Sequence, residues 1–420
     1  MVRIVILGAG FAGLNAAKVL AGSKNAKVTL IDQNNYHLFQ PLLYQVATAG
    51  LSPAEIAIPI RTIFSKYKNI KVFQGEGHEI IFKKNSVLTD IGEFKYDYLI
   101  VACGARHIYY GNDEWEIYAP GLKTIAQGTE IRRRVLTAFE KAETEKNIER
   151  KRKLLTFVIV GGGSTGVELA GALGELSRFT FKKDFKNIDL NQTRIVLIEA
   201  GPRILPDFTE KLSARAQFDL EKIGVQVLTS KEVTNIDANG VNIGHERIET
   251  ATVIWAAGIQ ASDLNKQLQG SLDSMGRIYV EPDLSLKKNP NIFIAGDQAH
   301  FAHQTGKPLP ANAPVALQQG RFVASNILRE INGNDREQFQ YIDKGQLSTI
   351  GRNKAIIEIG KLSLSGFWAW LFWLFVHIYY LIGFKNKLIV LLQWAFSYLS
   401  YQKGARLVVD KTWQFYSKDE

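Results

Sequence analysis

Two stretches decide the fold: Ile4–Gly13 reads IVILGAGFAG and Phe157–Gly166 reads FVIVGGGSTG in a chain of 420 residues. Each is an apolar run typical of a β-strand, followed by G-x-G-x-x-G and a helical pattern. The first glycine permits the tight turn, the second lets the backbone approach a pyrophosphate, and the third lets helix and strand pack closely. The pyrophosphate then lies on the free N–H groups of the helix N-terminus. Two such loops predict two dinucleotide-binding units and electron transfer between the two ligands.

An acidic residue completes each unit at the end of its next predicted strand. Asp32 ends VTLID about twenty residues after the first loop, as the fingerprint requires. Glu199 follows RIVLI at a longer spacing, which predicts an inserted loop over 178–192. A carboxylate here accepts hydrogen bonds from a ribose diol and repels a 2′-phosphate, so Glu199 favours NADH over NADPH. The alternative reading, a mere glycine-rich turn, would leave two complete units unexplained.

Composition sets further limits. The apolar fraction of 46% and charged fraction of 22% are those of a globular chain with two or three domains. The single cysteine, Cys103, excludes both an internal disulfide and a redox-active C-x-x-C pair. The N-terminus runs directly into a predicted strand, so we do not expect secretion. No cluster of metal ligands is visible, and no metal site is predicted.

The segment NIFIAGD, which ends at Asp297, predicts a buried strand and a tight turn that ends in an acidic residue. At the carboxyl end of a strand this acid can reach the ribityl chain of a flavin, or it can cap the following helix. The first unit is therefore interrupted by the second and resumes near Arg277. We predict an α/β fold with two Rossmann-like domains, one inserted in the other, and a C-terminal membrane-associated helical segment. The predicted parts are 1–120 and 276–345 for FAD, 121–275 for NADH and 346–420 for the membrane.

Three longer motifs carry a resemblance to a known family. They are YHLFQPLLYQVATAGLSP from Tyr36, GGGSTGVELAGAL from Gly161 and APVALQQG from Ala313. Together with the aromatic C-terminus, they resemble the flavoproteins with two dinucleotide-binding domains and, within them, the type II NADH:quinone oxidoreductases. The resemblance runs along nearly the whole chain. It implies oxidation of NADH by FAD, then reduction of a membrane quinone, menaquinone or ubiquinone, without proton pumping.

The motifs and the resemblance together give candidate cofactor residues. For FAD we expect Gly8, Gly10, Phe11, Ala12, Gly13, Leu14, Asp32, Asn34, Asn35, Gln40, Pro41, Leu42, Glu76, Cys103, Gly104, Gly296, Asp297 and Ala313. For NADH we expect Gly161, Gly163, Ser164, Thr165, Gly166, Glu199, Ala257 and Gly258. We interpret Cys103 as a small packing residue beside the flavin, without a catalytic role.

The resemblance also implies a catalytic acid and a quinone site. The family's glutamate that matches Glu168 lies between nicotinamide and flavin and relays protons, which requires a pKa raised by burial. The alternative is a carboxylate in the first turn of a helix, where the macrodipole favours it. The quinone is expected at Ala316 and Gln318. Here the chain departs from the family, because Pro314 replaces a glutamine and cannot hydrogen-bond a quinone carbonyl, which leaves the quinone's identity open.

The C-terminus contains two aromatic-rich apolar runs, 366–382 and 388–399. The first approaches the length of about twenty residues that spans a bilayer, but its Trp and Tyr content favours the interface. We expect a monotopic anchor on the cytoplasmic side of the inner cell membrane; a span and a buried dimer interface are the alternatives. The net charge of +10 suits an anionic leaflet. We expect a homodimer and no nucleic-acid partner. His377 lies within the first run, either near the quinone entrance or as a hydrogen-bonded structural residue.

Two other functions stay open at this point. One is a reductase of the same fold that passes electrons to ferredoxin, rubredoxin or oxygen, for which a membrane-seeking C-terminus has no use. The other is a non-enzymatic NADH-binding flavoprotein of the apoptosis-inducing-factor type, which rapid NADH turnover would exclude.

Overall fold

The computed structural model describes residues 1–400 and 403–409, so parts of the region predicted over 346–420 lie outside the described residues. The chain forms two compact units. Unit 1 comprises Met1–Leu38, Ala57–Ile108 and Ile259–Lys344; unit 2 comprises Phe39–Ile56, Tyr109–Gly258 and the described residues from Gly345 onward. These are units of packing, so the predicted functional boundaries at 120/121, 275/276 and 345/346 stay a prediction.

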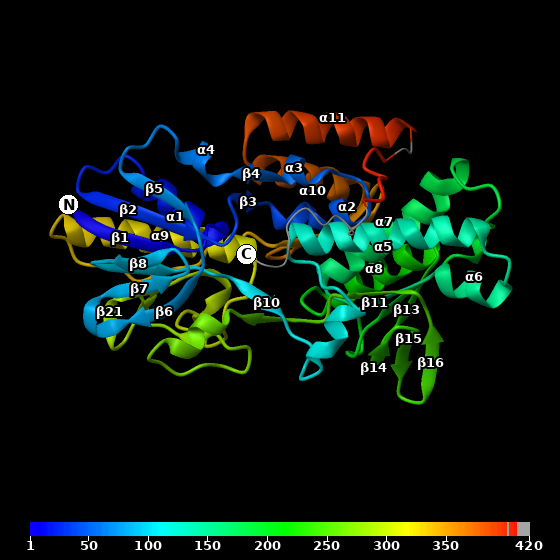
Figure 1. Cartoon of the computed structure of the whole chain (residues 1–420), viewed down its shortest axis with the longest axis horizontal. Coiled ribbons are helices and arrows are strands. Elements are labelled where there is room, and N and C mark those ends of the chain that lie inside the picture. The colour runs from blue at the N-terminus through cyan, green and yellow to red at the C-terminus, as the bar shows by residue number, and fades with distance from the viewer. Residues whose placement is uncertain (401–402, 410–420) are drawn as a thin grey trace, which may run out of the picture. The chain divides into compact units, whose positions relative to one another are not determined.

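Unit 1 is built on a six-stranded sheet with the order β20-β21-β9-β1-β2-β5. Figure 1 labels its strands β1, β2, β5 and β21. Its strands are β1 (Val2–Leu7), β2 (Ala26–Asp32), β5 (Ile70–Gln74), β9 (Tyr98–Val101), β20 (Ser285–Leu286) and β21 (Asn289–Ile294). All pairs are parallel except β20–β21. Residues 4–7 of β1 are all buried, as expected for a parallel strand that is covered on both faces.

Helices α1 (Phe11–Leu20) and α9 (Ala313–Ile331) of unit 1 pack directly against each other. Their contact needs a glycine, because a Cβ on Gly320 would lie only 2.1 Å from the Ala12 carbonyl oxygen. The helix that begins at the first dinucleotide loop is thus held by the helix that contains the third motif. Parts of the sequence about 300 residues apart therefore meet beside the loop.

Smaller elements complete unit 1. They are β3 (Tyr36–Leu38) with β4 (Ala57–Pro59), α4 (Ile60–Phe64), the antiparallel β6 (Gly77–Ile81), β7 (Ser86–Thr89) and β8 (Gly92–Lys95), β10 (Ala105–His107) with β18 (Ile259–Ala261), and β19 (Ile278–Tyr279) with β22 (Ala299–His300).

Unit 2 contains the second predicted Rossmann sheet, with the parallel order β13-β12-β11-β17. Its strands are β11 (Thr156–Val160), β12 (Arg194–Ile198), β13 (Val225–Leu228) and β17 (Thr252–Trp255), and its helices are α5 (Ile125–Thr144), α6 (Ile148–Leu154), α7 (Ser164–Glu175) and α8 (Glu210–Lys222). The inserted loop between α7 and β12 is confirmed. It consists of a π-helical turn (Leu176–Thr180) and short 3₁₀ turns (Phe181–Lys183 and Leu190–Gln192).

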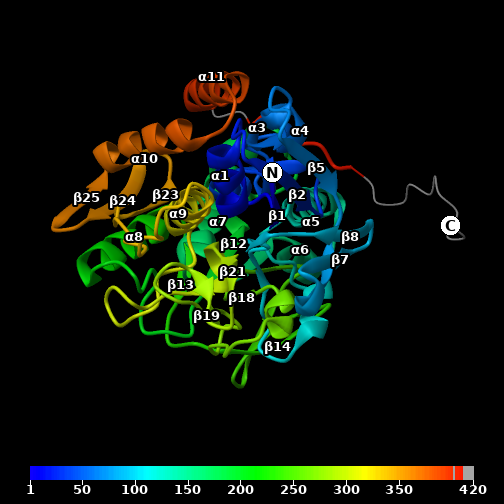
Figure 2. The same ribbon diagram turned by 90° about the vertical axis from the view of Figure 1, so that its left-hand side faces the viewer.

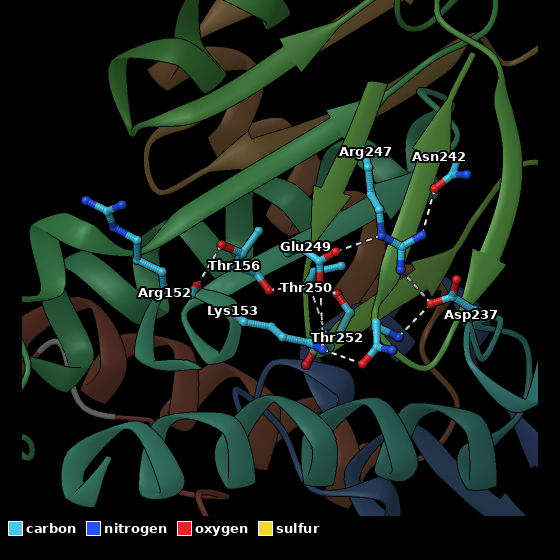
Figure 3. Close-up of polar contacts among 10 residues, drawn as sticks. Arg152, Lys153, Thr156, Asp237, Asn242, Arg247, Glu249, Thr250 and Thr252 are labelled. Atoms are coloured by element: carbon cyan, nitrogen blue, oxygen red, sulfur yellow. Dashed lines mark hydrogen bonds and ion pairs between the residues drawn. The ribbon is translucent and has the colours of Figure 1, made fainter. Parts of the chain in front are cut away.

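A three-stranded antiparallel sheet follows in unit 2, formed by β14 (Val233–Asp237), β15 (Gly240–Ile243) and β16 (Glu246–Glu249). Figure 3 shows the polar contacts within this sheet and between the sheet and α6. Arg247 donates to Asp237 at 2.8 Å and to Glu249 at 2.7 Å. Lys153, at the end of α6, pairs with Glu249 at 3.8 Å. Exposed ion pairs such as these contribute little free energy, so they fix local geometry more than stability.

The C-terminal part of unit 2 is a sheet covered by helices (Figure 2). Strands β23 (Gln346–Gly351), β24 (Lys354–Ile359) and β25 (Leu362–Gly366) contact both α8 and α10 (Phe367–Tyr380), and α10 contacts α11 (Phe384–Ser400). Segment 39–56, with α2 (Leu43–Ala47) and α3 (Pro53–Ile56), joins this group: Trp394 donates to Gln45 at 2.8 Å, and α11 contacts α3. In the part of the chain that the structure describes, no helix is long and apolar enough to cross a bilayer.

Candidate functional site

The first dinucleotide loop of unit 1 has two crowded glycines and one open glycine. A Cβ on Gly8 would lie 2.2 Å from the Ala102 carbonyl oxygen, and a Cβ on Gly13 would lie 1.8 Å from that of Gly8. A Cβ on Gly10, in contrast, meets no atom within 4 Å. Only the open side can receive a ligand, so the loop is shaped for a pyrophosphate at the N-terminus of α1. This fits FAD.

Asp32 fastens this loop to the end of β2. Its Oδ2 accepts the Ala9 N–H at 2.6 Å, and its Oδ1 accepts the Asn34 N–H at 2.7 Å. Burial raises the pKa of Asp32, and these two N–H groups counteract the increase. Beside it, Gln33, Gln74, Gly75, Glu76 and Asp90 line an open cavity of about 330 Å³. The predicted FAD residue Glu76 thus lies in a cavity large enough for an adenosine group.

The other predicted FAD residues of unit 1 follow neighbouring strands. Cys103 and Gly104 come after β9, and Gly296 and Asp297 come after β21, in the 3₁₀ turn Gly296–Gln298. Because β21, β9 and β1 are adjacent and parallel, their carboxyl ends meet. The remaining residues are Phe11, Ala12 and Leu14 in α1, Asn35 after β2, and Ala313 at the start of α9. Of these, Ala12 and Phe11 pack with Ala102 and Ala295. The structure groups Gln40, Pro41 and Leu42 with unit 2.

Cys103 is exposed in the structure, so its place as a packing residue beside the flavin stays a prediction. Its Sγ lies 3.8 Å from the Leu7 carbonyl oxygen, and desolvation raises the pKa of the thiol to about 12. Such a thiol is uncharged at neutral pH and is a poor nucleophile.

Sequence reasoning missed two buried amide groups that hold these turns. The Gln298 side chain accepts the Cys103 N–H at 2.5 Å and donates to Asn265 at 2.8 Å. The Gln319 side chain accepts the Gly296 N–H at 2.7 Å. Gln298 and Gln319 are at most 1% exposed, so their bonds form away from water and fix the turns firmly. The only sequence signal was their position beside Asp297 and Gln318.

The second loop, in unit 2, repeats the first. A Cβ on Gly166 would lie 1.9 Å from the Gly161 carbonyl oxygen, whereas a Cβ on Gly163 meets nothing within 4 Å. Glu199 accepts the N–H groups of Gly162 at 2.6 Å and Gly201 at 2.7 Å. Each unit therefore joins the second residue of its loop to the acid of the next strand. Ser164 and Thr165 are exposed in the first turn of α7.

Ala257 and Gly258 follow β17, which is the neighbour of β11 in the sheet. A Cβ on Gly161 would lie 2.5 Å from the carbonyl oxygen of Ala256, so this turn touches the loop. The structure thus brings the predicted NADH residues together at the carboxyl ends of three adjacent strands.

Glu168 is the fifth residue of α7, in its second turn, so the placement in the first turn was wrong. The reason is that α7 begins at Ser164, and Gly166 is already inside the helix. Oε1 of Glu168 lies 3.4 Å from the backbone nitrogen of Thr349 in β23. Burial raises the pKa of its carboxyl to about 8, and the Thr349 N–H opposes the shift. The raised pKa that a general acid needs is therefore present.

Residues of the predicted quinone motif lie in the first turns of α9. Pro314 occupies the second position of the helix, where its missing N–H leaves no hydrogen bond unmade. The Gln318 amide pairs with the backbone of Ile342, donating at 2.9 Å and accepting at 3.0 Å. Ala316 is buried against Ala12, Ala102 and Ala295. Both polar ends of Gln318 are thus engaged within unit 1.

His377 lies inside unit 2, on α10. It is 6% exposed, its Nδ1 hydrogen-bonds the Trp373 carbonyl oxygen at 2.8 Å, and its ring stacks on Trp373 at 3.9 Å. Burial lowers the pKa of His377 to about 4, so the ring is neutral at physiological pH. This geometry agrees with the structural alternative; a place near the quinone entrance stays a prediction.

Comparisons with known proteins agree with this architecture. Residues 2–320 match the family described as pyridine nucleotide-disulphide oxidoreductase. The chain is similar to the type II NADH:quinone oxidoreductase Ndh of Mycobacterium tuberculosis, with 42% identity over 97% of this chain and 90% of that protein. It is similar to NdhA of the same organism at 40% identity, over 97% and 90%.

Solved structures show the same fold. The structure of NDH2 from Plasmodium falciparum in complex with NADH superposes with a TM-score of 0.87 at 23% identity, covering 96% of this chain and 99% of that one. The sulfide:quinone oxidoreductase of Aquifex aeolicus gives a TM-score of 0.74 at 18% identity, with 92% of each chain covered.

Proposed function

This chain belongs to the pyridine nucleotide-disulphide oxidoreductase family and, within it, to the type II NADH:quinone oxidoreductases, and on that basis we propose which of its residues serve each half of the reaction. It is an FAD-dependent enzyme that oxidises NADH and reduces a quinone. The family confirms the predicted α/β fold and sets aside the two alternative functions. The proposal concerns the residues, the quinone and the membrane side.

Unit 1 binds FAD, which supplies the chemistry that accepts a hydride and returns electrons. The open side of Gly10 at the start of α1 would receive the pyrophosphate, and Asp32 would accept hydrogen bonds from a ribose. Asp297 would bind the ribityl chain. It lies in the turn after β21, and the buried Gln298 beside it fixes that turn through its bonds to Cys103 and Asn265. The adenosine end uses the cavity that contains Glu76.

Unit 2 binds NADH in the same manner. The open side of Gly163 receives the pyrophosphate and the ribose diol binds Glu199, while Ala257 and Gly258 support the nicotinamide end. The observation that carries this assignment is the repeated geometry: in each unit the acid accepts the N–H of the second loop residue at 2.6 Å. Anionic Glu199 excludes a 2′-phosphate, so NADH is the substrate.

Glu168 supplies a proton for quinone reduction. Its carboxyl is neutral at neutral pH because burial raises its pKa to about 8, so it holds a transferable proton. Pro314 removes one hydrogen-bonding side chain from the usual quinone motif. Menaquinone and ubiquinone therefore remain the two candidate acceptors. A contact of the quinone with Gln318 and Ala316 stays a prediction, because the Gln318 amide already bonds Ile342 and Ala316 is buried.

The enzyme acts at a membrane as a peripheral protein. The proposed contact surface is the exposed apolar side of α10 and α11, which consists of Phe367, Trp368, Leu371, Phe372, Phe375, Tyr379, Phe384, Leu388, Leu391, Leu392, Phe396 and Leu399. Residues 367–400 contain no Asp or Glu, so nothing opposes contact with an anionic leaflet. We place this surface on the cytoplasmic side, where NADH is made. A homodimer stays a prediction, which analytical ultracentrifugation can test.

Stopped-flow absorbance of the flavin tests the two-step order. Anaerobic NADH should bleach the flavin of the membrane-reconstituted enzyme, and menaquinone or ubiquinone analogues should restore it. The analogue with the faster recovery identifies the acceptor class. Fast bleaching without recovery by either analogue would contradict the quinone assignment for this chain.

A further inference from the structure

Tyr110 is the exposed member of an aromatic cluster at the end of β17. Tyr109 stacks on Trp255 with ring centroids 5.0 Å apart, Trp115 meets Trp255 edge-on at 5.9 Å, and all three are at most 5% exposed. Tyr110 lies 6.4 Å from Trp255, yet 64% of it is exposed. A large ring held in the open beside three buried ones offers a surface to a ligand.

The backbone of Tyr110 is also unusual. Its φ is +52°, a region that bulky side chains rarely adopt. Its hydroxyl donates to the Ala257 carbonyl oxygen at 2.9 Å, which holds the residue in place. Residues kept in sparsely populated conformations concentrate at ligand sites, where the surrounding structure over-determines them.

The anchor of Tyr110 lies at the second dinucleotide loop. Ala257 follows β17, and its nitrogen is 2.6 Å from the position of a Cβ on Gly161. Glu199 follows β12, on the opposite side of β11 in the order β12-β11-β17. A dinucleotide whose adenosine ribose binds Glu199 and whose pyrophosphate crosses the loop therefore directs its other half toward β17 and Tyr110.

We propose that Tyr110 positions the nicotinamide half of NADH. Its hydroxyl proton is committed to Ala257, so the oxygen keeps lone pairs that accept the carboxamide N–H₂ of the nicotinamide. Its ring forms an apolar wall beside the ribosyl-nicotinamide. The inference rests on the NADH site proposed above and adds a residue that touches the reactive half of the substrate.

Calorimetric titration of the detergent-solubilised, FAD-loaded enzyme with NAD⁺ and with ADP-ribose tests this. ADP-ribose lacks the nicotinamide, so a contact with that group affects NAD⁺ alone. The variants are Tyr110→Gly, Tyr110→Phe and Glu199→Gln, with Tyr279→Phe as control because Tyr279 is a half-exposed tyrosine of unit 1. Glycine adopts positive φ readily, so Tyr110→Gly keeps the backbone while removing the side chain.

We expect Tyr110→Gly to weaken NAD⁺ about tenfold and leave ADP-ribose unchanged, with Tyr110→Phe in between. Glu199→Gln should weaken both ligands, and Tyr279→Phe neither. Unchanged NAD⁺ affinity in Tyr110→Gly, with Glu199→Gln still weakening both ligands, would overturn the role of Tyr110 and keep the NADH site. Equal weakening of both ligands by Tyr110→Gly would show a merely structural role and overturn it as well. If Glu199→Gln changes neither ligand, the NADH site itself is wrong.

Discussion

Oε1 of Glu168 lies 3.4 Å from the backbone nitrogen of Thr349, so α7 and β23 meet at a carboxyl group whose pKa burial raises to about 8. A single N–H donor at that distance stabilises an anion only weakly. The protonated acid therefore predominates below pH 8. An uncharged carboxyl at neutral pH is what proton donation requires, whereas a helix-start carboxylate would be charged.

Replacing Glu168 with Gln removes that proton while keeping the side chain's shape. We expect quinone reduction to slow about 100-fold, and flavin bleaching by NADH to change little. In the native enzyme the quinone step should slow as pH rises through about 8, because the acid loses its proton there. Single-turnover rates between pH 6 and about 9.5 would show this limb, and a variant that retains it would exclude Glu168 as its source.

The same carboxyl predicts a pH dependence of stability. Its pKa is about 8 in the folded chain and near the ordinary 4.5 in the unfolded chain, so between these values the folded state binds more protons. The free energy of unfolding should therefore fall as pH rises through this window. Glu168→Gln should remove that part of the slope, about 3 kcal/mol between pH 5.5 and 8.5, as measured by chemical denaturation. Parallel curves for both proteins would contradict the shift.

The open glycines of the two loops give a matched pair of variants. A Cβ on Gly10 or Gly163 meets no protein atom within 4 Å, and neither residue has a positive φ. Gly10→Ala should therefore fold but lose most of its FAD, seen as a lower ratio of flavin to protein absorbance. Gly163→Ala should keep its FAD and raise KM for NADH about tenfold. The reverse pattern would exchange the two cofactor assignments.

Glu199→Gln tests the choice between NADH and NADPH. Gln keeps only one of the two acceptor oxygens for the ribose diol and no longer repels a 2′-phosphate, so binding should weaken while the preference for NADH falls about tenfold in kcat/KM. Glu246→Gln is the control, because Glu246 is an exposed acid of the same unit. An unchanged preference would remove Glu199 from the ribose site.

Two exposed residues can be changed to test whether the apolar side of α10 and α11 binds the membrane, without disturbing the hydrophobic core. Phe375 on α10 and Leu392 on α11 are 66% and 62% exposed, so the double change Phe375→Asp/Leu392→Asp should leave the fold intact. Cosedimentation with anionic vesicles should fall about tenfold or more. Ile148→Asp, at a 70% exposed position on α6, should bind as the native enzyme does. Undiminished vesicle binding by the double variant would show that the membrane contact does not lie on this side of α10 and α11.

The sequence alone identified both loops and both acids, because glycine spacing and the strand that follows are local properties. It could not separate Gln318 from Gln319, since neighbouring helical residues point to different sides: one pairs with Ile342 at the surface, and the other is buried against Gly296. Tyr110 had no local signal at all, because its importance comes from a bond to Ala257, 147 residues away.

The division of the chain has a consequence for biosynthesis. The strands of the NADH sheet come from one stretch, 156–255, whereas the sheet of unit 1 takes strands from 2–7 through 289–294, and α9, which packs on α1, ends at Ile331. A nascent chain emerging from the ribosome can close the NADH sheet early. It completes the flavin-binding unit only after about four-fifths of the polypeptide has been made. Flavin is therefore expected to be incorporated late in synthesis, and a chain truncated by premature termination before α9 is expected to remain an apoprotein.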